Sequence, residues 1–116
     1  GDAAEAERLA ETIQDEKLRI STFVTMSGIA RKRGKARAAA ELGARAMGLA
    51  RELKIPLDMA FVLADLATAQ AAAGDGEAAR ATLTEAVGIA AKIIDPWARA
   101  RALSKAASAL VAIDGI

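Results

Sequence analysis

The sequence predicts an all-α protein, an α-solenoid of antiparallel helix hairpins with about six helices and a forty-residue period. Turn residues recur at that period, since Gly34 is followed by Gly74 and Pro56 by Pro96. The apolar residues between them fall at helical spacing, and segments with the alternation of a strand are absent. Small and large residues also keep this register: Ala39, Ala46, Gly48 and Ala50 recur as Ala79, Ala86, Gly88 and Ala90, and Ala60, Leu63, Ala67 and Ala69 recur as Ala100, Leu103, Ala107 and Ala109.

The expected helices cover residues 2–14, 16–33, 35–54, 56–73, 76–94 and 96–113. Pro56 suits the first turn of a helix, where its missing N–H would have no partner in any case. Gly74 suits the left-handed residue that ends a helix, and Asp75 can cap the helix that follows. Asp95 and Pro96 begin the next cycle with a capping residue and a proline.

We interpret residues 1–116 as a single domain of repeats. Residues 2–14 are the second helix of a partial repeat, 15–54 and 55–94 are repeats, and 95–116 contain the first helix of a partial repeat. Glycine within a helix costs roughly 0.5–1 kcal/mol relative to alanine. Because Gly48 and Gly88 recur at one position despite this cost, we expect them to allow close approach of helix axes.

The repeat resembles the tetratricopeptide repeat family. The residues that match the family's pattern of large and small positions and its Gly-Asp turn are Leu63, Leu66, Ala67, Gln70, Gly74, Asp75, Ala79, Leu83 and Ala86. Leu63 stands where tryptophan is common in the family, and Gly43 replaces a large residue. The period exceeds the family's usual length of about 34 residues. It is similar to the longer-helix variant found in bacterial regulators of the maltose-activator type and in kinesin light chains.

The resemblance implies that the first helix of each pair lines a concave, peptide-binding groove. Ala64 lies among the positions carried over in this way. The polar, charged and aromatic candidates for the groove are Thr25, Arg31, Lys32, Phe61, Asp65, Thr68, Arg101, Ser104, Lys105 and Ser108. The set contains four cations and one carboxylate, so we expect a protein or peptide partner with an acidic segment or a free C-terminal carboxylate.

Two further features admit more than one interpretation. Residues 30–37 contain five cations, which we interpret as a solvated turn between helices, with an anion-binding role for Lys35 and Arg37 as the alternative. Trp97 follows Pro96 at the start of a helix. We expect its ring to pack near Ile93 or Ile94, and the alternative is a binding role.

Composition excludes several function classes. The sequence has 16 basic and 15 acidic residues, and it contains neither cysteine nor histidine. A thiolate nucleophile, an imidazole base and an ordinary zinc site are therefore excluded within this chain, and we expect no enzymatic activity, no metal and no cofactor. The near-neutral charge and the lack of interleaved aromatic residues argue against nucleic-acid binding. Neither a membrane span nor a signal peptide is visible, and we expect a cytoplasmic location.

These observations together predict a non-catalytic scaffold that binds proteins or peptides. The alternative is a self-association or sensor module of a larger bacterial regulatory protein. The terminal helices would expose faces that a further repeat normally covers, which would allow a homo-oligomer.

Overall fold

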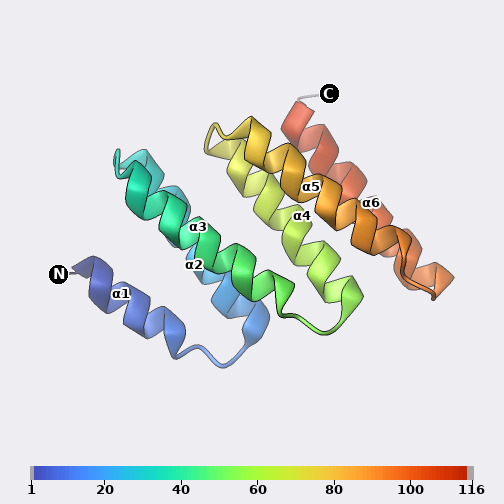
Figure 1. Cartoon of the computed structure of the whole chain (residues 1–116), viewed down its shortest axis with the longest axis horizontal. Helices are drawn as coiled ribbons and strands as arrows, with labels where there is room; N and C mark the ends of the chain where they lie inside the picture. The colour runs from blue at the N-terminus through green and yellow to red at the C-terminus, as the bar shows by residue number, and fades with distance from the viewer. Residues whose placement is uncertain (1, 115–116) are drawn as a thin grey trace. The chain divides into compact units, whose positions relative to one another are not determined.

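The computed structural model describes residues 2–114, and every regular element in that range is an α-helix (Figure 1). The helices fall into two compact units, one made of α1, α2 and α3 and the other of α4, α5 and α6. The prediction of six helices and no strand is confirmed for these residues. Their bounds are α1 Asp2–Glu11, α2 Glu16–Lys32, α3 Ala36–Arg51, α4 Pro56–Ala72, α5 Gly76–Ala91 and α6 Pro96–Asp114.

The helix boundaries repeat every forty residues. Helices α2, α4 and α6 begin at residues 16, 56 and 96, and α1, α3 and α5 end at residues 11, 51 and 91. Gly34 and Gly74 end α2 and α4 with positive φ angles of 76° and 89°. Because L-residues with a side chain rarely adopt this conformation, glycine is the residue these two turns require.

Aspartates start three of the helices. The carboxylate of Asp15 accepts a hydrogen bond from Leu18 N at 2.9 Å, and that of Asp75 accepts one from Ala78 N at 3.2 Å. Asp95 accepts one from Ala98 N at 2.8 Å, as its expected capping role requires. Each bond satisfies an amide at the helix N-terminus that has no partner within the helix.

The second helix of each hairpin ends earlier than the sequence indicates. The expected ends were residues 14, 54 and 94, whereas α1, α3 and α5 stop three residues before them. Leu53 and Ile93 follow the helices but are only 7% and 9% exposed. These residues continue the apolar periodicity from a loop, so their spacing alone does not distinguish them from another helical turn.

The first unit is built on a hairpin of α2 and α3, with α1 packed against α2. Its largest buried side chains are Ile20 and Phe23 of α2, each 1% exposed. The closest approach at a helical glycine occurs at Gly43, where an added Cβ would lie 3.4 Å from Ser27 Oγ. That hydroxyl donates a hydrogen bond to the Ala39 carbonyl at 2.6 Å, which ties α2 to α3.

The expected packing role of Gly48 and Gly88 is wrong. Both glycines are exposed, and a Cβ added at either would meet nothing within 4 Å. Their recurrence therefore reflects no close contact that the structure shows.

The second unit consists of the hairpin of α4 and α5 with α6 packed against both helices. Leu63 of α4 is 0% exposed. One buried cluster contains Ala64, Ala67, Leu83, Ala106 and Ala109, and another contains Ala60, Ala90, Ile93 and Ala102. Alanine is thus the main contact residue, which allows the three helices to pack closely.

No helix among the described residues combines the length and the apolar character needed to cross a membrane.

Candidate functional site

The predicted groove residues are distributed over three helices. Thr25, Arg31 and Lys32 lie on α2 in the first unit, where Thr25 and Lys32 are exposed and Arg31 is half-buried. The second unit holds the remaining candidates, which are Phe61, Asp65 and Thr68 on α4 and Arg101, Ser104, Lys105 and Ser108 on α6. Within this unit, the structure brings four of the candidates into contact.

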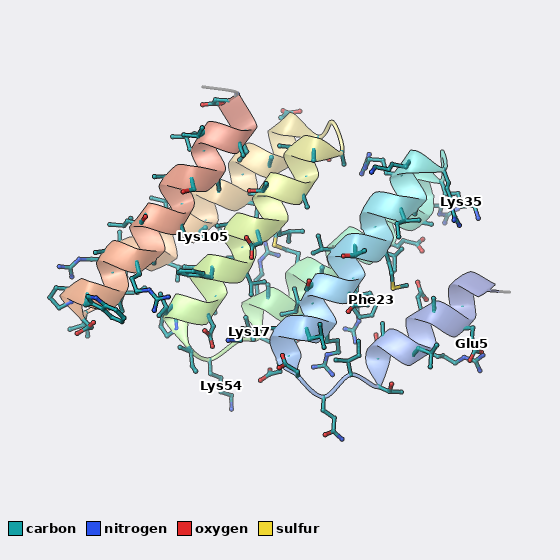
Figure 2. All side chains as sticks on the ribbon, turned by 180° about the vertical axis from the view of Figure 1, so that it is seen from behind. Glu5, Lys17, Phe23, Lys35, Lys54 and Lys105 are labelled. Carbon is teal, nitrogen blue, oxygen red and sulfur yellow. The ribbon has the colours of Figure 1, made fainter. Side chains whose placement is uncertain are left out.

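Lys105 links α6 to α4 through two interactions. Its Nζ lies 2.7 Å from Asp65 Oδ1 and 5.7 Å from the ring centroid of Phe61. Figure 2 shows Lys105 on the side of α6 turned toward α4. The side chain of Lys105 is 33% exposed and that of Asp65 is 66% exposed, so water screens the ion pair. Exposed pairs of this kind typically contribute about 0.2–1 kcal/mol, and an incoming anion can therefore compete for Lys105.

Arg101 lies one helical turn before Lys105 and contacts two aromatic rings. Its Cζ is 5.6 Å from the ring centroid of Phe61 and 4.9 Å from that of Trp97. Both distances fall within the range of a cation–π interaction. No carboxylate among the described residues forms an ion pair with Arg101. The rings therefore hold a guanidinium that lacks an acidic partner within this part of the chain.

We call the five residues Phe61, Asp65, Trp97, Arg101 and Lys105 the α4–α6 surface. It carries two cations and one carboxylate, so its formal charge is +1. Arginine binds carboxylates through parallel N–H donors, and stacking on aromatic rings restricts its side chain before a ligand arrives. This arrangement is suited to binding a carboxylate next to an apolar group.

The other candidate residues of the second unit are not part of the α4–α6 surface. The Thr68 hydroxyl donates a hydrogen bond to the Ala64 carbonyl of its own helix at 3.1 Å, and the side chain is half-buried. Ser104 and Ser108 are exposed on α6. Ala64 does not face outward as expected, because α6 packs over it and leaves it 0% exposed.

Trp97 is the residue of this surface that the candidate set omitted. Trp97 is 69% exposed and Ile94 is 92% exposed, so the expected packing of the ring on Ile94 does not occur. The spacing offered a signal, because Trp97 and Arg101 lie four residues apart on one helix and such pairs face each other. Phe61 could be added to this pair only once the packing of α6 on α4 was known.

The basic segment of residues 30–37 forms the end of α2, the turn at Gly34 and the start of α3. Lys32, Arg33, Lys35 and Arg37 are exposed, and Arg37 Nε lies 3.5 Å from Glu41 Oε1. Both earlier interpretations, a solvated turn and an anion-binding turn, remain consistent with these positions.

Comparisons with protein-family models, with curated proteins and with solved structures find no match to this chain.

Proposed function

We propose that this chain is a non-catalytic, tetratricopeptide-like scaffold whose hairpins stack as a solenoid. We further propose that its α4–α6 surface binds the carboxylate of a protein or peptide. Repetition of the helix boundaries every forty residues supports the repeat assignment. The contacts of Arg101 with two aromatic rings, without an acidic partner among the described residues, support the binding role. Self-association is the alternative.

The chemistry of the surface favours a ligand with both an anionic and an apolar group. A charge-assisted hydrogen bond contributes about 1.5–3 kcal/mol, more than one between neutral groups. The exposed ring of Trp97 offers apolar area beside the guanidinium, and tryptophan is enriched among residues that dominate binding energies. An acidic side chain and a free C-terminal carboxylate present the same group, so both are compatible with this site.

Trp97 provides the readout for a binding test because it is the only tryptophan in the chain. Its fluorescence would be followed while synthetic pentapeptides are added to the 116-residue protein. One peptide carries glutamates around a leucine and an amidated C-terminus. A second has no charged side chain and ends in a leucine whose free carboxylate is its acidic group. A third is uncharged and amidated. We expect binding of the first or the second peptide and none of the third, and which of the two binds identifies the source of the carboxylate.

Charge reversals locate the site. We expect Arg101→Glu to weaken binding at least about tenfold, since it replaces the anion receptor with a like charge. Lys35→Glu changes the net charge equally but lies at the turn between α2 and α3, so affinity should stay within about twofold. The proposal is wrong if the affinity for the binding peptide survives Arg101→Glu. Loss in Lys35→Glu alone would assign the ligand to the basic turn.

A further inference from the structure

A row of apolar residues on α6 is exposed to solvent, whereas most of the equivalent residues of α4 are buried. Its members are apolar, recur at helical spacing and are exposed, with Leu103 at 39% and Leu110 at 42%. They are Ala100, Leu103, Ala107 and Leu110, which we call the α6 stripe. Forty residues earlier, Ala60, Leu63 and Ala67 occupy the equivalent positions and are 2%, 0% and 0% exposed. The internal repeat thus provides a direct comparison between a covered stripe and an uncovered one.

The covered stripe shows which residues provide the cover. Ala60 of α4 belongs to a buried cluster with Ala90 and Ile93, from the end of α5 and the loop after it. Leu57 packs against the same cluster. A helix that covers the α6 stripe in the same way needs a small residue near Ala100, the equivalent of Ala60. It also needs a large apolar residue near Trp97, the equivalent of Leu57.

Helix α1 carries these residues in the same register. Ala10 and Ile13 lie eighty residues before Ala90 and Ile93, and α1 ends at the position equivalent to the end of α5. One side of α1 packs against α2. On another side, Leu9 is 61% exposed, whereas its counterpart Leu49 on α3 is only 7% exposed. Ala10 is itself only 2% exposed, so the side of α1 that is free to meet α6 is the one that carries Leu9, whose counterpart Leu49 is buried.

The charges of the two segments are opposite. Helix α1 contains Asp2, Glu5, Glu7 and Glu11 against Arg8. Glu5 pairs with Arg8 and Glu11 pairs with Arg45 of α3, which leaves Glu7 as the acidic residue near the end of the helix that forms no ion pair with the described residues. Residues 96–105 contain three cations, Arg99, Arg101 and Lys105, and no carboxylate. In an antiparallel pair like α4 and α5, the end of α1 would lie beside the beginning of α6. Opposite charge would then favour encounter between the two segments.

We propose that α1 of a second copy of this chain packs antiparallel on the α6 stripe, giving a head-to-tail assembly. The two surfaces in contact differ, so the interface is heterologous and each added copy leaves one free α1 and one free α6. This inference goes beyond the carboxylate-binding proposal. The two proposals share Trp97, Arg101 and Lys105, but Leu103 and Leu110, whose cover is proposed here, lie outside the α4–α6 surface.

Sedimentation velocity of the 116-residue protein, from about 1 µM to about 1 mM, tests the first expectation. We expect the average mass to rise with concentration beyond 11.9 kDa. A protein that remains at this mass over the whole range overturns the proposal, and the cover of α6 is then something other than a second copy.

A mixing experiment tests the head-to-tail geometry. Leu9→Glu removes the α1 contact and Leu103→Glu removes the α6 contact, so each variant alone should associate at least about tenfold more weakly. An equimolar mixture should restore one interface and give a species of about twice 11.9 kDa. If Leu9→Glu still associates as well as the original protein, or the mixture remains monomeric, this geometry is wrong.

Two controls keep the outcome interpretable. Val87→Glu places the same charge on an exposed residue of α5, outside both contacts, and should leave association unchanged. Circular dichroism verifies that each variant keeps its helices. If either glutamate variant unfolds, Leu9→Ser and Leu103→Ser make smaller changes at the same exposed sites, and the same mixing result is expected of them.

Discussion

Gly34 and Gly74 end their helices with the same backbone hydrogen bonds, forty residues apart. The amide of Lys35, after Gly34, donates to the Ala30 carbonyl at 2.9 Å, and the amide of Asp75, after Gly74, donates to the Gln70 carbonyl at 2.9 Å. The glycine amides themselves donate to the carbonyls three residues before them, both at 3.0 Å. This pair of hydrogen bonds defines the Schellman motif, and its recurrence shows that the two turns are equivalent.

Substitution of these glycines should destabilise the protein because of their positive φ angles and not because of a steric clash. An added Cβ at Gly74 meets nothing within 4 Å, but its φ of +89° is unfavourable for alanine. We expect Gly74→Ala to lower the free energy of unfolding by about 1–2 kcal/mol. Gly88→Ala is the matched control, because that glycine is helical and exposed, and it should raise stability by about 0.5–1 kcal/mol. Urea denaturation measures both, and equal effects of the two substitutions would contradict this account.

The helices and turns were predictable because their signals are local. A proline at the start of α4, aspartates before α5 and α6, and Gly74 at the end of α4 each act within a few residues of their own position. Their repetition added information, since each feature in one hairpin supported its counterpart in the other. The all-α class followed from these local signals.

The candidate site was predictable only in part because it depends on packing. The resemblance to the tetratricopeptide repeat implied that Phe61, Asp65, Arg101 and Lys105 share one groove, and the structure brings these four side chains into contact. Sequence gave no reason to exclude Ala64, which α6 buries completely. For Trp97 it favoured packing over a binding role, since large aromatic side chains are usually buried to a great extent.

The positions that begin α2, α4 and α6 should differ in their response to substitution. Asp15 and Asp95 cap their helices, whereas the equivalent Ile55 makes no side-chain cap and is 58% exposed. We expect Asp95→Ala to cost about 1 kcal/mol of unfolding free energy. Ile55→Ser should instead gain about 0.5 kcal/mol by supplying the missing acceptor. Thermal unfolding followed by circular dichroism measures both changes, and a loss of stability in Ile55→Ser would show that its partly buried isoleucine outweighs a cap.

Acid should weaken the contact between α1 and α3. Arg45 donates hydrogen bonds from Nε and Nη2 to the two carboxylate oxygens of Glu11, at 2.9 and 2.8 Å. These bonds lower the pKa of Glu11 below its ordinary value, with a smaller opposing effect of desolvation. Since the pKa is lower in the folded state, the contribution is complete above the unfolded pKa of about 4.3 and is lost as the pH falls through the folded pKa.

Glu11→Gln isolates this contribution because it removes the titrating group and keeps the side chain's size. The thermal midpoint of the original protein should exceed that of the variant at pH 7, and the difference should shrink below about pH 4. The comparison is between two proteins at each pH, so the protonation of other carboxylates affects both. A difference that stays constant from pH 7 to pH 2.5 would contradict the assigned role of the Glu11–Arg45 pair.

Asp65 should act as an internal competitor at the proposed carboxylate site. It holds Lys105 at 2.7 Å, and an incoming carboxylate must share or displace it. Asp65→Asn leaves Arg101 and Lys105 with no acidic group on the α4–α6 surface, so we expect the acidic pentapeptide to bind about three- to tenfold more tightly. Glu77→Gln removes one negative charge from an exposed position in the first turn of α5 and serves as the matched control.

Trp97 fluorescence measures both affinities, and the gain should diminish at 1 M salt, where screening shortens the range of the interaction to about 3 Å. Equal gains in the two variants would mean that net charge alone attracts the peptide, and no gain in Asp65→Asn would mean that Lys105 does not contact it.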